Sequence, residues 1–371
     1  MIEEKKIIGV YEEIISKKNL YRAVYNAARG KRYNGSVSDF LFYQERNIND
    51  LHSCLLSGAY RHGKYNNFLI TDPKRRQISA APFRDRVVHH AVHDVIEPLI
   101  DRSFIHDSYA CRKDKGTHKA LDRAQKFLRA NKFCFHGDIR KYFSSINHEI
   151  LKELLREKIA DVDLLSLLDK IIDSANQAVD EKGVGLPIGN LTSQFFANLY
   201  LNELDYFVKH FLRCRYYLRY MDDFLIFDND KRYLKSIKGK VRNFLNEKLK
   251  LGLHEGKSQV YLCEQGVKFL GFRLYPFYRR LTSENVRRFK KRIKNFEVLL
   301  AKKAVSRDFV KASLKCWTAH SMYASTYKLR ERIVKEVIKR DSRLFGDCAG
   351  YILPYLNQQP SDHPGWSTLL C

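Results

Sequence analysis

The 371-residue chain is 44% hydrophobic and 13% aromatic, which is enough apolar material for a sizeable core in about two or three subdomains. Lys and Arg total 67 against 42 Asp and Glu, and this net charge of +25 predicts a polyanionic partner, with nucleic acid preferred over charge kept for solubility alone. The cysteines lack zinc-site spacing and no apolar run reaches the ~18 residues of a membrane span, so we expect a reduced, cytoplasmic protein without membrane association.

The first part of the chain is predicted to be helical over 1–30 and 39–58, with a turn at 35–38. Two short strands around Asp72-Pro73 then predict a basic hairpin. A helix should follow from about Arg84 until Pro98, because proline disrupts a helix interior.

The middle of the chain alternates between strands and helices. The pattern predicts a strand at 132–139, a helix at 147–159, a helix from near Thr192, a tight hairpin at 216–227 and a strand pair at 268–276. From about Ser283 the pattern changes to long helices, followed near 306–319 and 326–340 by two more, with basic residues crowding one face of the first. The tail is predicted to be irregular. The sequence therefore indicates an α+β core followed by a basic helical bundle.

Two adjacent carboxylates interrupt the apolar hairpin segment "RYMDDF", at Asp222 and Asp223. At ~4 Å and an effective dielectric of ~20 their repulsion is of order 4 kcal/mol, which protonation, solvation or a divalent cation can relieve. A third acid, Asp138, ends an apolar strand, where an unpaired buried carboxylate is costly. If that strand lies beside the hairpin, the three acids can hold two Mg²⁺ ions about 3.5–4 Å apart for in-line phosphoryl transfer.

Six blocks in a fixed order resemble the reverse transcriptases: "DPKRRQISAAPFRDRVVHHAV", "GDIRKYFSSI", "GLPIGNLTSQFFANLYL", "RYMDDF", "LHEGKS" and "FLGF". They span roughly residues 60–275. The resemblance implies an α+β right-hand polymerase fold, with fingers, a palm in which an antiparallel sheet packs on helices, and a C-terminal three-helix thumb. The implied domains are an N-terminal helical extension at 1–60, fingers at 61–130 with part of 150–185, a palm at 131–275, a thumb at 276–345 and a tail at 346–371.

The resemblance also implies catalytic roles. Asp138, Asp222 and Asp223, together with the backbone carbonyl of Ile139, correspond to the ligands of two Mg²⁺ ions, with Mn²⁺ as an alternative metal. Lys257 corresponds to the lysine that protonates the departing pyrophosphate, and an ordinary surface lysine is the alternative.

The nucleotide and the template–primer have their own implied contacts. Phe143 matches the aromatic steric gate that rejects a ribose 2′-hydroxyl and so selects deoxynucleoside triphosphates. Contacts to the nucleotide are implied for Lys74, Arg75, Arg76, Ile188 and Gly189, and which of the three cations clasps the triphosphate stays open. Contacts to template or primer are implied for Ser193, Gln194, Tyr220, Met221, Phe269, Leu270, Gly271, Arg287 and Lys291.

Two departures from the usual reverse transcriptase pattern indicate a particular lineage of that family. Ile188 replaces a nucleotide-contacting Gln, and Gln194 replaces a Pro. "LPIGNLTSQ" resembles the reverse transcriptases of diversity-generating retroelements, which copy a template-repeat RNA into cDNA with errors at adenines. Those enzymes work with a small basic accessory protein that forms a pentameric barrel. Because Ile188 offers only apolar contact, we hypothesise that Ile188 and Arg76 together set the error frequency.

Three other readings stay open. The chain could be a retron or phage-defence reverse transcriptase, a group II intron-like protein, or a non-catalytic RNA-binding scaffold that keeps the fold.

Overall fold

The computed structural model describes residues 6–71, 75–179 and 181–340. This part of the chain forms two compact units. The first contains the described residues up to Gly116, 135–226 and 231–259, and the second contains 117–134, 227–230 and the described residues from Val260 onward. Both mix helices with strands, so the fold class is α+β, as the sequence predicted. No helix among the described residues is long and apolar enough to cross a membrane.

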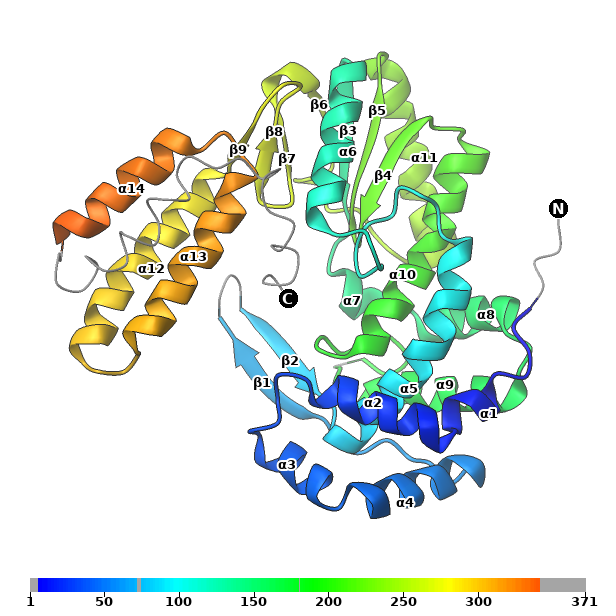
Figure 1. The fold of residues 1–371 in the computed structure, drawn as a ribbon. Helices are drawn as coiled ribbons and strands as arrows, with labels where there is room; N and C mark the ends of the chain where they lie inside the picture. The colour runs from blue at the N-terminus through cyan, green and yellow to red at the C-terminus, as the bar shows by residue number, and fades with distance from the viewer. Residues whose placement is uncertain (1–5, 72–74, 180, 341–371) are drawn as a thin grey trace. The chain divides into compact units, whose positions relative to one another are not determined.

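The first unit begins with helices and a hairpin. These elements are α1 (Tyr11–Ile15), α2 (Lys17–Ala28), α3 (Gly35–Phe42), α4 (Gln44–Leu56), β1 (Asn66–Ile70), β2 (Arg76–Ala80), α5 (Phe83–Ile100) and the short η1 (Asp101–Ser103). α2 lies along α5 (Figure 1). β1 and β2 pair antiparallel, which confirms the predicted hairpin.

The predicted turn at 35–38 is wrong, because α3 begins at Gly35. The Asn34 side chain accepts a hydrogen bond from the Ser36 N–H, so this polar cluster caps a helix. The long helix expected over 1–30 is also broken, at Ser16, whose extended backbone separates α1 from α2. α5 continues past Pro98 to Ile100 before it ends.

The rest of the first unit carries the middle of the chain. Its helices are α7 (Tyr142–Ser145), α8 (His148–Lys158), α9 (Val162–Ser174), η2 (Ala175–Gln177), α10 (Leu191–Tyr206), the π-helical η3 (Phe207–Phe211) and α11 (Lys231–Leu249). A four-stranded sheet has the order β4-β5-β3-β6, from β3 (Phe133–Asp138), β4 (Tyr216–Tyr220), β5 (Asp223–Asp228) and β6 (Gln259–Leu262), of which β6 belongs to this unit only through Gln259. The predicted strand at 132–139 and the hairpin at 216–227 are therefore confirmed.

Close approach of β3 and β5 requires a glycine. A Cβ placed on Gly137 would lie 2.2 Å from the ring of Phe224, and that ring is fully buried. The neighbouring Phe135 meets Phe224 edge-to-face at 5.8 Å. Since Gly137 and Phe224 each stand beside an aspartate of interest, this packing fixes the two strand ends relative to each other.

The second unit contains α6 (Thr117–Ala130), η4 (Cys263–Gln265), an antiparallel sheet and a helical bundle. The sheet is β7 (Val267–Phe269), β8 (Phe272–Leu274) and β9 (Arg279–Leu281). The bundle is α12 (Ser283–Ala301), α13 (Arg307–Met322) and α14 (Tyr327–Arg340), close to the three helices predicted. Phe289 of α12 stacks on Trp317 of α13 at 3.8 Å, which joins the two helices seen side by side in Figure 1.

Candidate active site

Two neighbouring strands bring the three predicted aspartates together. Asp138 is the last residue of β3, Asp223 is the first residue of β5, and Asp222 lies in the tight turn between β4 and β5. Met221 gives this turn its shape with a φ of 56°. The Ile139 N–H donates a 3.2 Å hydrogen bond to the Asp222 carbonyl, which ties the end of β3 to the turn.

The three carboxyls interact electrostatically. Burial, together with the nearby charges of Asp223 and Asp138, raises the pKa of Asp222 to about 6. Burial also raises the pKa of Asp223, with Asp138 adding to the effect. The negative charge of each carboxylate therefore makes ionisation of the neighbouring carboxyls less favourable.

Two nitrogen groups contact these carboxylates. The Lys257 Nζ donates to both oxygens of Asp138 at 3.0 Å. The His136 Nε2 lies 2.6 Å from Asp223 Oδ1, and His136 and Asp138 share one face of β3 because they are two residues apart. Both contacts offset the negative charge of the cluster.

The backbone of Asp138 is held in place from the following segment. Its N–H donates to Ser258 Oγ at 3.1 Å, and its carbonyl accepts from the His254 N–H at 2.8 Å. Ser258 is fully buried and is the next residue after Lys257. The segment that holds the Asp138 backbone therefore also positions Lys257 beside the Asp138 carboxylate.

Two of the carboxylates, those of Asp138 and Asp222, line a cavity of about 1010 Å³ within the first unit. Its lining includes Asp138, Ile139, Asp222 and Lys257, together with Arg75, Arg76 and Ile188. Lys74, the third predicted triphosphate contact, lies outside the described residues. The cavity thus combines acids on one side with guanidinium groups from the β1–β2 hairpin.

The loop that carries Ile188 is bonded directly to that hairpin. The Ser79 N–H of β2 donates to the Ile188 carbonyl at 3.0 Å. Gly189 has a φ of 120°, and a Cβ there would lie 2.9 Å from Ile78 Cγ2, so this position favours glycine. The loop that carries Ile188 is consequently hydrogen-bonded to β2, the strand that begins with Arg76.

The two adjacent aromatic residues after β3 occupy different environments. Tyr142 is a core residue at 2% exposure, and its hydroxyl donates to the Ala197 carbonyl. Phe143 is only half-buried. The residue proposed as a steric gate is therefore the more accessible of the pair.

The other predicted template and primer residues are distributed over both units. On α10 Ser193 is buried, whereas Gln194 is exposed and accepts from the Cys111 thiol at 3.3 Å. In the hairpin, Tyr220 is half-buried and Met221 is 9% exposed.

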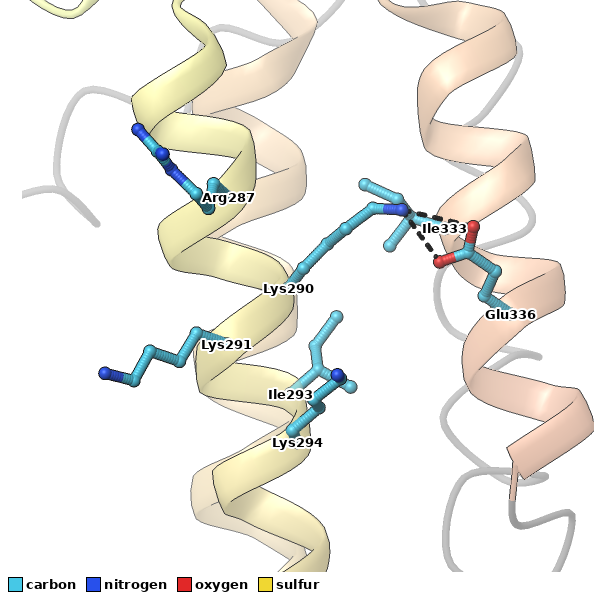
Figure 2. Close-up of a pocket in the computed structure, with 7 residues that line it drawn as sticks. All are labelled: Arg287, Lys290, Lys291, Ile293, Lys294, Ile333 and Glu336. Carbon is cyan, nitrogen blue, oxygen red and sulfur yellow. Dashed lines mark hydrogen bonds and ion pairs between the residues drawn. The ribbon is translucent and has the colours of Figure 1, made fainter.

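The remaining five residues belong to the second unit. Phe269 is buried at the end of β7, and Leu270 and Gly271 form the following turn with φ values of 47° and 84°. Arg287 and Lys291 of α12 are among the lining residues of a pocket that α14 completes with Glu336, although both side chains extend away from α14 (Figure 2). In that pocket the Lys290 Nζ bonds both oxygens of Glu336, at 3.2 and 3.0 Å.

A buried ion pair that was not predicted from the sequence joins the β4–β5 hairpin to α10. The Arg219 side chain and Asp205 of α10 are both fully buried, with Nη2 and Oδ2 2.6 Å apart. Arg219 Nη1 also donates to the Met221 carbonyl at 3.1 Å, so the pair supports the turn that presents Asp222. A charged residue inside the apolar run "YYLRYM" is the signal that could have predicted a buried partner.

A metal site is not preformed in the described ranges: no three His, Cys, Asp or Glu side chains there are grouped so as to hold an ion as they stand. Two of the carboxylates instead contact Lys257 and His136. The donor set nevertheless fits a hard divalent cation, because it consists of carboxylate oxygens whose mutual repulsion a cation would relieve.

Comparison with known proteins identifies the family of the chain. Residues 67–274, more than half of the chain, match the family described as "Reverse transcriptase (RNA-dependent DNA polymerase)". Protein YkfC of Escherichia coli is 27% identical over 266 residues, covering 59% of this chain and 69% of YkfC. The group II intron-encoded protein LtrA of Lactococcus lactis is 24% identical over 299 residues, covering 62% of this chain but only 50% of LtrA.

A solved structure of apo telomerase from Candida Tropicalis aligns with 83% of this chain and 64% of the telomerase chain, at a TM-score of 0.47 and 12% identity. The extent of the family match decides the assignment. The chain belongs to the reverse transcriptase family, the RNA-dependent DNA polymerases.

Proposed function

We propose that the cavity lined by Asp138 and Asp222, next to Asp223, is where this chain joins deoxynucleotides to a primer on an RNA template. The observation that carries the proposal is that three acids from two distant segments interact beside a cavity that is also lined by three arginines and two lysines. This pairing of acids with cations suits a reaction whose substrates are a metal-bound triphosphate and a hydroxyl.

The acids would hold the metal ions, together with the Ile139 carbonyl. When bound, the ions would neutralise the carboxylates, assist ionisation of the primer hydroxyl and offset charge on the leaving pyrophosphate. Lys257 contacts both oxygens of Asp138 and His136 contacts Oδ1 of Asp223, so metal binding would have to share or replace these contacts. The Lys257 ammonium is thereby kept beside the carboxylates, where it can give a proton to a leaving phosphate oxygen.

The cations on the hairpin would bind the triphosphate. Arg75 and Arg76 line the cavity, and a guanidinium fork matches phosphate oxygens in geometry and charge. Half-buried Phe143 would contact the sugar and exclude a 2′-hydroxyl, which makes the substrates deoxynucleoside triphosphates. The proposed subdivision places this site in fingers (61–130) and palm (131–275), with a thumb at 276–345.

For the lineage we propose a diversity-generating retroelement. The support is Ile188 and Gln194, at the two positions where the block departs from the usual pattern. The proposed template is then a template-repeat RNA, copied with errors at adenines, and the proposed partner is a small basic barrel-forming protein. The relatives favour a second candidate, a group II intron-like reverse transcriptase, since LtrA is a group II intron-encoded protein.

Primer extension tests the site. With Mg²⁺, an RNA template and a DNA primer, Asp222→Asn should abolish incorporation, and Asp228→Asn at the other end of β5 is the matched control. Incorporation by Asp222→Asn at the wild-type rate would refute the assignment.

Sequencing the cDNA tests the lineage. Wild type should show substitutions concentrated at template adenines, and Ile188→Gln should reduce them. An error spectrum spread evenly over the four template bases would favour the group II intron-like candidate.

A further inference from the structure

α2 has two chemically distinct faces. Its apolar face is buried in the first unit through Leu20, Ala23, Val24, Ala27 and Ala28, on the side where α2 runs along α5. Asn19 adds a buried polar link by donating to the Ala91 carbonyl of α5 at 3.0 Å. The helix is thus firmly anchored, and its outer side chains project from a fixed support.

The outer side of α2 and the turn after it form what we call the α2 face. Between residues 17 and 33 the chain has six cations and no Asp or Glu, and all six are exposed: Lys17, Lys18, Arg22, Arg29, Lys31 and Arg32. One acid from α5 approaches it, since Asp94 lies 3.8 Å from Arg22. The α2 face is therefore strongly positive.

Three tyrosines lie among these cations. Tyr21, Tyr25 and Tyr33 are 41%, 62% and 103% exposed. Tyr21 and Tyr25 are one helical turn apart and so lie on the same side of α2. The Arg32 guanidinium lies 5.8 Å from the centre of the Tyr25 ring, which places a phosphate-binding group beside a ring that a base can stack on.

Lys31 lies near a further cation of the first unit. Burial lowers the pKa of Lys31, and the charge of Arg86 on α5 lowers it further. A bound polyanion would offset the repulsion between Lys31 and Arg86.

We propose that the α2 face binds a single-stranded segment of RNA outside the polymerase cavity. The choice of RNA as the polyanion rests on the proposed function. A single strand fits better than a duplex, because exposed tyrosines stack on unpaired bases, whereas the bases of a duplex are already stacked on one another and leave mainly phosphates and 2′-hydroxyls for contact. The face lies outside residues 67–274, the part of the chain that matches the family.

Fluorescence anisotropy on the full chain tests the proposal. The probe is a labelled single-stranded RNA of about 16 nucleotides, added after the polymerase cavity is saturated with an unlabelled RNA template–DNA primer duplex. Tyr21→Ala/Tyr25→Ala should weaken probe binding roughly 10- to 100-fold. The matched control is Tyr206→Ala, which removes a 58% exposed helical tyrosine of the same unit and should change nothing.

The charges are tested separately. Lys18→Gln/Arg29→Gln should reduce the slope of log affinity against log salt by about 0.7 for each phosphate that the variant no longer neutralises. Extension of a short template by both double variants should remain at the wild-type rate. If the wild type extends no primer, the proposed function fails, and the anisotropy result still decides the α2 face on its own.

Two results would overturn the inference. One is an unchanged probe affinity and salt slope in both double variants, with folding verified by circular dichroism. The other is loss of binding to polyglutamate, but not to RNA, in Tyr21→Ala/Tyr25→Ala, which would make the α2 face a docking surface for an acidic protein.

Discussion

The buried pair of Arg219 and Asp205 makes the sharpest stability prediction. Asp205→Asn keeps the size of the side chain but removes its charge, so the guanidinium is left in the core without a counter-charge. Although burial alone would lower the pKa of Arg219, the charge of Asp205 raises it above its ordinary value, so the arginine stays charged in the native protein. Arg219 Nε and the Tyr217 hydroxyl both donate to Asp205 Oδ1, at 2.7 and 2.6 Å.

Removing one partner of such a pair costs about 3–5 kcal/mol, because the remaining charge is buried and uncompensated. Native domains are stable by only about 5–15 kcal/mol, so this cost is a large fraction of the total. It corresponds to a fall in Tm of roughly 10 °C. By contrast, the exposed Arg46–Asp50 pair is 3.9 Å apart, and Asp50→Asn should change stability by only about 0.5 kcal/mol.

Urea unfolding followed by circular dichroism measures both variants. A second variant, Arg219→Met/Asp205→Leu, should lose less stability than Asp205→Asn because no charge remains buried, with the rest of its destabilisation due to the Tyr217 hydroxyl. A destabilisation below about 1 kcal/mol in Asp205→Asn would refute the reasoning. The buried ion pair would then contribute no more to the free energy of unfolding than an exposed ion pair does.

Three further predictions concern pH, packing and substrate choice. Burial lowers the pKa of His89 to about 3 from the ordinary 6.5, so its contribution to stability is full above pH 6.5 and is lost as the pH falls toward 3. His89→Phe should therefore flatten the acid side of the stability–pH curve, and an unchanged curve would contradict this. Gly137→Ala forces a Cβ into the ring of Phe224 and should cost about 1–3 kcal/mol and most of the polymerase activity, whereas Gly239→Ala, in a helix with nothing within 4 Å, should gain up to about 1 kcal/mol. Equal melting temperatures for these two glycine variants would argue against the packing account. Phe143→Ala should lower the preference for dCTP over CTP in single-nucleotide incorporation by roughly tenfold or more, and an unaltered ratio would remove Phe143 from the sugar site.

The sequence predicted those elements that local patterns determine. The hairpin of β4 and β5 and the three C-terminal helices follow from periodicity and capping residues. The turn expected at 35–38 failed because Gly and Ser serve both turns and helix starts, and only the hydrogen bond from Ser36 to Asn34 decides between them.

The environment of the proposed site was less accessible to sequence reasoning. A resemblance identified the acids, but the contacts of Lys257 with Asp138 and of His136 with Asp223 depend on how distant segments pack. The same holds for Arg219, whose partner on α10 cannot be chosen from spacing alone. Tertiary pairing of polar groups was therefore the main information that the sequence did not supply.

The backbone bond between Ser79 and Ile188 limits how such an enzyme can change. It joins the strand that begins with Arg76 to the loop that carries Ile188, so a displacement of one segment should displace the other. Under the proposed roles, a substitution at Ile188 that changes its contact with the nucleotide would therefore also displace Arg76, the proposed triphosphate contact. Copying accuracy and nucleotide affinity should thus vary together among variants of this loop, so that selection for one would alter the other.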